Sequence, residues 1–259
     1  MPRYKLTLEY DGSAFVGWQR QAEGASVQGA LEAAVEAFRQ VRVTAVAAGR
    51  TDSGVHALGQ VAHVDLPDAQ PPETVRKALN AHLRPAPVAV VEAVPVADTF
   101  HARFSAVERA YRYRVLNRPG PPVLDRGRVW WEPRPLDTAA MAEAAAGLTG
   151  RHDFSTFRAS ICQAGSPVKT LDVLDVTGAG EEIHITARAR SFLHHQVRIL
   201  AGTLVRVGLG RWTPADVRAA LEARDRRAGG PTAPAHGLYF TGVAFAPGAE
   251  TGTDGGSET

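Results

Sequence analysis

The stretch AAGRTDSGVHALGQVAHVD contains an arginine, an acid and an imidazole within seven residues, namely Arg50, Asp52 and His56. Gly49 and Gly54 surround Asp52, and glycine tolerates the backbone conformations that a tight loop requires. A lone RTDSG is most often a hairpin turn with solvated charges, so the remainder of the chain has to decide its role. If Arg50 or another arginine pairs with Asp52, the carboxylate stays ionised even when a substrate excludes water. Such an acid can act as a nucleophile or as a base.

Two familiar kinds of site do not fit this stretch. The spacing of Gly49 and Gly54 resembles a phosphate-binding loop, but Val55 and His56 stand where lysine and serine or threonine are needed. A triad built on Ser53 and His56 lacks the strained turn that exposes a nucleophilic serine. Neither phosphate binding nor serine hydrolysis is therefore favoured.

Chemistry at a glycosidic bond with a single acid fits better. A glycosidase normally uses two carboxylates, and no second acid is near Asp52, since Asp65 lies at the far end of the next strand. The departure of uracil needs only one carboxylate, because the uracil anion is already delocalised over its ring nitrogens and carbonyls. If the detached base stays trapped, it can re-attach through a different atom.

The first half of the chain alternates between strand and helix periods. Leu6, Leu8 and Tyr10 alternate with polar residues, which predicts a half-buried strand, and Ser26 can cap the helix that follows. The other elements expected in this half are a helix over 27–38, strands over 42–48 and 58–66, a helix over 72–83 and a strand over 87–96. The order is β-α-β-β-α-β, with the RTDSG loop between the second and third strands.

The second half repeats that order with insertions. We expect a strand through Tyr111 and Tyr113, a helix over 137–148, a hairpin over 168–190, helices over 197–205 and 214–224, and a last strand, GLYFTGVAF. The predicted fold class is α+β: two ferredoxin-like βαββαβ units joined into one mixed, mostly antiparallel sheet, with helices on one face and a central cleft. The predicted domains are residues 1–105 and 106–246, followed by a disordered acidic tail over 247–259.

The amino-acid composition indicates the cellular compartment and the kind of partner to expect. The net charge is only +2, but the tail is acidic, and all but three of the 29 basic residues are arginines, which suit phosphate and base contacts. A single cysteine excludes an internal disulfide, and the chain has no long apolar run, so a cytoplasmic protein without a membrane segment is expected. We also expect no metal, because neighbours on a helix, such as His194 and His195, diverge by about 100°.

Six ordered motifs between about residues 4 and 246 resemble the bacterial tRNA pseudouridine synthase A family. They are YDGSAFVGWQRQ, GRTDSGVHALGQVAHV, FHARFSAVERAYRYRV, HDFSTFRAS, SFLHHQVRILAGTLVRVG and GLYF. The resemblance implies isomerisation of uridine to pseudouridine at positions 38–40 of the tRNA anticodon stem-loop, without cofactor or metal. It also implies a homodimer. Ser53 departs from the common alanine, and both residues are small.

The resemblance also implies roles for individual residues. Asp52 matches the catalytic aspartate, Tyr111 the aromatic residue that stacks on the uracil, and Arg198 the basic residue expected to pair with the aspartate. Leu238 matches an apolar wall of the site. Arg50 is expected either to pair with Asp52 or to fill the space left by the flipped base. The remaining candidate RNA contacts are His101, Arg103, Arg109 and Arg112.

Two other functions stay open on the sequence. A non-catalytic RNA-binding protein of ferredoxin-like modules would bind RNA through the arginines, but it leaves the placement of Asp52 unexplained. A nucleosidase or related hydrolase would release free uracil, and the missing second acid argues against it.

Overall fold

The computed structural model describes residues 1–251, which form two compact units. Unit 1 comprises Met1–Arg109 and the chain from Phe240 onward, and unit 2 comprises Ala110–Tyr239. The division therefore falls after Arg109 rather than after residue 105, and the last strand, expected in the second domain, returns to unit 1. Among the described residues, no helix combines the length and the apolar character needed to cross a membrane.

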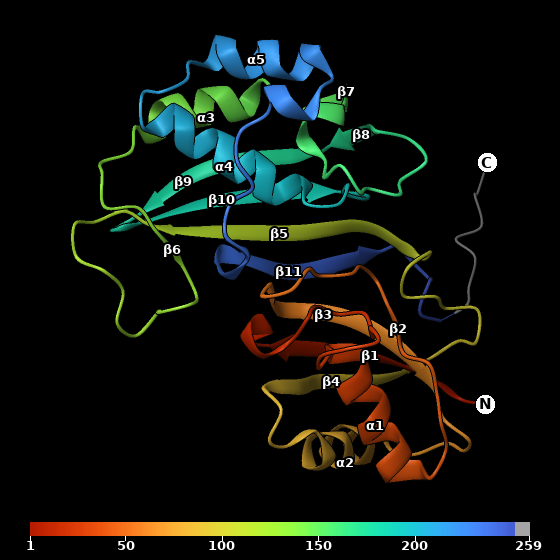
Figure 1. The fold of residues 1–259 in the computed structure, drawn as a ribbon. Helices are drawn as coiled ribbons and strands as arrows, with labels where there is room; N and C mark the ends of the chain where they lie inside the picture. The colour runs from red at the N-terminus through yellow and green to blue at the C-terminus, as the bar shows by residue number, and fades with distance from the viewer. Residues whose placement is uncertain (252–259) are drawn as a thin grey trace, which may run out of the picture. The chain divides into compact units, whose positions relative to one another are not determined.

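Unit 1 has the strand order expected of a ferredoxin-like unit. Its elements are β1 (Arg3–Tyr10), the short 3-10 helix η1 (Gly12–Ala14), α1 (Val27–Arg39), β2 (Val46–Ala47), β3 (His56–Asp65), α2 (Pro72–Leu83), β4 (Val88–Val96) and β11 (Leu238–Phe245), which begins in unit 2. The antiparallel order is β4-β1-β3, with β2 and β11 both pairing β3. Helices α1 and α2 cover one face of this sheet (Figure 1).

Two signals in the sequence, a capping residue and an apolar face, explain why the predicted α1 helix forms. The Ser26 hydroxyl accepts a hydrogen bond from the Gly29 backbone N–H at 3.1 Å, which satisfies one of the unpaired donors of the first turn. Val27, Leu31 and Val35 recur at helical spacing and are completely buried. The strand expected over 42–48 is shorter than predicted, since only Val46–Ala47 pair with β3.

Unit 2 is layered, with helices stacked on a sheet (Figure 1). Its elements are β5 (Ala106–Leu116), which begins in unit 1, β6 (Trp130–Trp131), α3 (Thr138–Ala146), β7 (Gly150–Asp153), η2 (Ser155–Phe157), β8 (Val168–Leu171), β9 (Val173–Ala179), β10 (Glu182–Ala189), α4 (Gln196–Gly208), α5 (Pro214–Ala223), η3 (Arg226–Ala228) and η4 (Ala235–Gly237). The main strand order is β5-β10-β9. Helices α3 and α4 pack together, and α3 separates α5 from β9. The fold class is α+β with mostly antiparallel strands, as predicted.

The hairpin expected over 168–190 is divided into three strands. β9 and β10 form the antiparallel hairpin, with Glu182 opposite Ala179, whereas β8 pairs with β7 in a separate two-stranded sheet. The prediction missed β7 because GRHD lacks the alternation of apolar residues that signals a half-buried strand.

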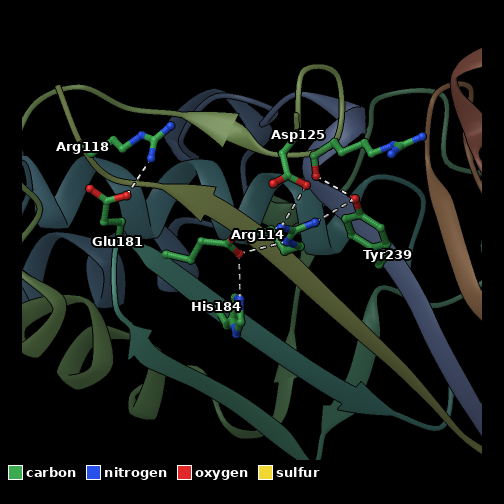
Figure 2. Close-up of polar contacts among 8 residues, drawn as sticks. Arg114, Arg118, Asp125, Glu181, His184 and Tyr239 are labelled. Atoms are coloured by element: carbon green, nitrogen blue, oxygen red, sulfur yellow. Dashed lines mark hydrogen bonds and ion pairs between the residues drawn. The ribbon is translucent and has the colours of Figure 1, made fainter. Parts of the chain in front are cut away.

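A polar network on Arg114 fastens the loop after β5 to the sheet (Figure 2). The Arg114 guanidinium donates to both carboxylate oxygens of Glu182, at 2.9 and 2.7 Å, and lies 3.4 Å from an Asp125 carboxylate oxygen. It also donates to the Tyr239 hydroxyl at 3.3 Å, and that hydroxyl donates to the Arg128 carbonyl at 2.7 Å. The hydrogen bond from Arg114 lowers the pKa of Glu182. The network thus joins β5, β10, the loop and the start of β11.

The first residues of the expected tail belong to unit 1. The Glu250 carboxylate accepts from the Lys5 ammonium at 2.5 Å, and the Glu250 carbonyl accepts from the Ala97 N–H at 2.9 Å. The prediction of disorder is therefore wrong for residues 247–251. The rest of the tail, 252–259, lies outside the described residues.

Candidate active site

The loop that carries Asp52 is held by the segment that follows β1. Gly17 and Asp52 form an isolated antiparallel bridge, and the Trp18 N–H donates to the Thr51 carbonyl at 3.0 Å. The Val55 N–H closes a turn on the Asp52 carbonyl at 3.1 Å. Asp52 itself is half-buried. The motifs YDGSAFVGWQRQ and GRTDSGVHA, separated in sequence, therefore build one loop structure around the carboxylate.

Two glycines make this close approach possible. A Cβ atom on Gly17, whose φ is +113°, would lie 2.6 Å from the Thr51 carbonyl oxygen, and one on Gly12 would lie 2.0 Å from the Val55 carbonyl oxygen. Both distances are below van der Waals contact, so any side chain at either position would push the Asp52 loop away.

A buried polar cluster lies beneath the loop. The Tyr10 hydroxyl is 2.8 Å from the Thr51 hydroxyl, and the Gln60 amide donates to the Gly49 carbonyl at 2.9 Å and to the Tyr10 oxygen at 3.4 Å. Burial raises the pKa of Tyr10 to about 12, so its hydroxyl stays neutral. Sequence reasoning missed Tyr10 and Gln60 as supports of the site, because each also fits a buried strand position.

His56, the first residue of β3, contacts the turn after β1 rather than a serine. Its Nδ1 accepts a hydrogen bond from the Gly12 N–H at 3.1 Å and lies 3.2 Å from an Asp11 carboxylate oxygen. Ser53 is exposed, and its hydroxyl donates to the Phe15 carbonyl at 3.3 Å. Ser53 and His56 therefore have different partners, which agrees with the argument against a hydrolytic serine.

The predicted RNA contacts of unit 1 fall into two kinds. Arg50 and Arg103 are exposed, and within residues 1–251 Arg50 makes no hydrogen bond or ion pair. Of its two predicted roles, pairing with Asp52 is therefore not seen. Arg109 is only 9% exposed, and its guanidinium donates to the backbone carbonyls of Ala48, Arg103 and Ala106. Arg109 therefore ties the backbone of Ala48 and Arg103 to β5.

In unit 2, β5 carries two tyrosines on one face. Tyr111 is 8% exposed, and its ring meets the Phe192 ring edge-on at 5.1 Å between centroids. Tyr113 is completely buried, its hydroxyl donates to the Pro234 carbonyl at 2.7 Å, and its ring lies where a Cβ on Gly237 would clash. Tyr113 is thus a core residue, whereas Tyr111 lies nearer the surface. Arg112, between them, is exposed.

Arg198 is tied to the segment that ends at Leu238. Its Nε donates to the Ala233 carbonyl at 2.9 Å, and the Ala233 N–H donates to the Arg198 carbonyl at 3.0 Å. Burial raises the pKa of Tyr113, and the positive charge of Arg198 is close enough to oppose that shift. Leu238 is 4% exposed. Residues 233–238 therefore connect Arg198 on α4 with Tyr113 on β5, and the segment ends at Leu238.

His194 and His195 lie before α4, which begins at Gln196. His195 has a φ of 62°, and the two ring centroids are 3.9 Å apart. The two histidines are not in a helix, as the sequence argument had assumed. The expected divergence of helical neighbours therefore does not apply to them. The absence of a metal site stays a prediction.

Each unit, taken by itself, offers groups of a different chemistry. Unit 1 supplies Asp52 on a loop whose backbone is fixed by hydrogen bonds and by close glycine contacts. Unit 2 supplies an aromatic ring, an arginine and a leucine on elements that are tied together by residues 233–238.

Comparison with known proteins identifies relatives of this chain. A family model described as tRNA pseudouridine synthase matches residues 7–105 and 144–246. A protein named tRNA pseudouridine synthase A from Paramagnetospirillum magneticum is 64% identical over 256 residues, which cover 98% of this chain and all of the relative. Proteins of the same name from Rhodospirillum rubrum and a Caulobacter species are 63% and 59% identical, each over 245 residues. The matches cover 95% of this chain and 88% and 98% of those relatives.

Proposed function

Because the chain belongs to the tRNA pseudouridine synthase family, whose members are isomerases, we propose that it converts uridine to pseudouridine at positions 38–40 of the tRNA anticodon stem-loop. The observation that carries the proposal is the placement of Asp52 on a restrained loop, since the Gly17 bridge and the hydrogen bond from Trp18 to Thr51 hold the backbone at Asp52 and just before it. We also propose that the enzyme is a cytoplasmic homodimer that needs neither metal nor cofactor.

In the proposed reaction, Asp52 assists cleavage of the bond between uracil N1 and ribose C1′. It does so either by attacking C1′ or by removing a ribose proton. The detached base then rotates within the site, and its C5 forms the new bond to C1′. C5 loses its proton and N1 gains one, so product and substrate have the same composition. No water is consumed, which explains why one carboxylate suffices where a glycosidase uses two.

Tyr111, Arg198 and Leu238 are proposed to contact the target base. An aromatic ring stacks on uracil, an apolar wall excludes water, and a guanidinium stabilises negative charge on the acid or on the departing base. The restraint of Arg198 by Ala233 supports this role, because a positioned cation needs no reorganisation during the reaction.

The uridine has to leave its stack before it can react, which costs a few kcal/mol. Arg50 is proposed to fill the vacated position, and its exposed side chain without a partner in the described structure suits that role. His101, Arg103 and Arg112 are proposed to contact the RNA. Arg109 is proposed to act through the segment that it holds.

The test uses unmodified tRNA transcripts with uridine at positions 38, 39 and 40, and maps carbodiimide-reactive products. New adducts at these positions, with no release of free uracil, are the expected result. Adducts only elsewhere in the tRNA would contradict the proposed target positions. Binding without any adduct would favour an RNA-binding protein, and free uracil would favour a nucleosidase. Sedimentation of the purified protein tests the dimer, which a monomer at micromolar concentration would contradict.

A further inference from the structure

The loop before β5 exposes an aromatic ring that the proposed function does not use. Phe104 is 72% exposed, although it belongs to a well-packed part of unit 1. The His101 ring stacks on it with 4.3 Å between centroids and 29° between planes. The Arg103 guanidinium carbon lies 5.6 Å from the centre of the Phe104 ring. Phe104 therefore presents a supported aromatic surface to solvent, with a cation beside it.

The loop that holds this ring is fixed by backbone contacts. The Arg3 guanidinium donates to the carbonyls of Asp98 and Phe100, at 2.6 and 2.7 Å. The Ser105 N–H donates to the His101 carbonyl at 2.8 Å, and the buried Arg109 guanidinium donates to the Arg103 carbonyl at 2.5 Å. The ring is thus preorganised, and little conformational entropy is lost when a ligand stacks on it.

The support beneath Phe104 is a pair of histidines. His101 Nδ1 accepts from the N–H groups of Arg103 and Phe104, both at 3.2 Å. The His63 ring meets the His101 ring edge-on at 4.9 Å, and His63 Nδ1 accepts from the Ala102 N–H at 3.1 Å. Burial, with Arg3 adding to the effect, lowers the pKa of both rings, that of His63 to about 4. The two rings of this support are therefore uncharged at neutral pH.

We propose that Phe104 is a stacking platform for an unpaired nucleobase of the tRNA, outside the uridine-binding residues. A flat ring beside a cation fits a base attached to a phosphate, because base stacking uses the ring and the arginine binds the phosphate. Within the described residues Arg103 has no carboxylate partner, so an incoming base can displace its guanidinium from the ring toward a phosphate. This inference rests on tRNA being the substrate, as proposed above.

Three substitutions of Phe104 separate stacking from other roles. Phe104→Ala and Phe104→Leu both remove the aromatic face, and leucine keeps an apolar side chain, whereas Phe104→Trp keeps the face. We expect alanine and leucine each to raise the dissociation constant for unmodified tRNA about tenfold, and tryptophan to change it less than about twofold. The matched control is Val91→Ala, which truncates another exposed apolar residue of unit 1 and leaves binding unchanged.

Turnover distinguishes this role from catalysis. At saturating tRNA, the rate of pseudouridine formation by Phe104→Ala is expected to stay within about twofold of the wild-type rate, because stacking outside the reacting base adds uniform binding. Unchanged affinity of the alanine variant would overturn the proposal. Full affinity of the leucine variant, or dissociation of a dimer by Phe104→Ala in sedimentation, would also overturn it, since the ring would then serve apolar packing or a protein interface. If the wild-type protein binds tRNA but forms no pseudouridine, only the proposed function fails.

Discussion

Gly17→Ala tests whether the loop around Asp52 depends on a close backbone contact. The new Cβ would lie 2.6 Å from the Thr51 carbonyl oxygen, and real Cβ atoms do not approach within 3.0 Å, so at least one backbone has to move by about 0.4 Å. The φ of +113° adds about 1–3 kcal/mol of strain for any residue with a side chain. A displacement of this order at a catalytic group lowers kcat/KM by about tenfold to a hundredfold.

The assay compares pseudouridine formation and thermal unfolding of Gly17→Ala with those of Gly178→Ala. Gly178 lies on β9, and a Cβ there would meet no atom within 4 Å. We expect the control to keep full activity, and Gly17→Ala to lose activity while it remains folded at the assay temperature. A folded Gly17→Ala protein with wild-type kcat/KM would refute the reasoning, because the loop would then tolerate a moved backbone.

Two further predictions concern stability. Because burial lowers the pKa of His63 to about 4, its contribution to stability is complete above the unfolded pKa of about 6.5 and is lost as pH falls toward 4. We expect about 2 kcal/mol of pH-dependent stability over this range after screening by solvent, and urea unfolding of His63→Gln should show a smaller slope with pH. Arg114→Met should lower the free energy of unfolding by about 1–3 kcal/mol, because it leaves Glu182 and Asp125 without their shared cation. Arg118→Met breaks an exposed pair with Glu181 and two exposed hydrogen bonds to the carbonyls of Gly120 and Pro121, and it should cost less than about 1 kcal/mol (Figure 2). Equal losses in the two variants would contradict this account.

The elements with clear periodicity could be predicted from the sequence. The α1 helix begins at the Ser26 cap, α2 has the predicted bounds, and the first strand ends at Tyr10 as expected. These elements are set by local signals, namely a capping side chain and the spacing of apolar residues. β6 and β7 have no such signal, because their pairing depends on partners that are distant in sequence. The return of the chain to unit 1 at Phe240 is likewise a tertiary property.

The candidate site shows the same limit. Asp52 could be identified from the sequence because it is an acid on a glycine-bounded loop beside an arginine. The Tyr10–Thr51–Gln60 cluster beneath it did not, since its members lie on separate elements that only the fold brings together. For Arg109 the sequence suggested an exposed charge that could contact RNA. In the structure its guanidinium instead donates hydrogen bonds to buried backbone carbonyls. Charge alone therefore could not separate RNA contacts from residues that support the fold.

The most direct test of the account is the rate of pseudouridine formation by Asp52→Asn on unmodified tRNA. Asparagine keeps the size of the side chain and the backbone contacts of Gly17 and Thr51, but it removes the charge. We expect the rate to fall by at least about a hundredfold, with tRNA affinity and the unfolding temperature close to wild type. If Asp52→Asn retains wild-type turnover, another group carries out the reaction and the central claim is wrong.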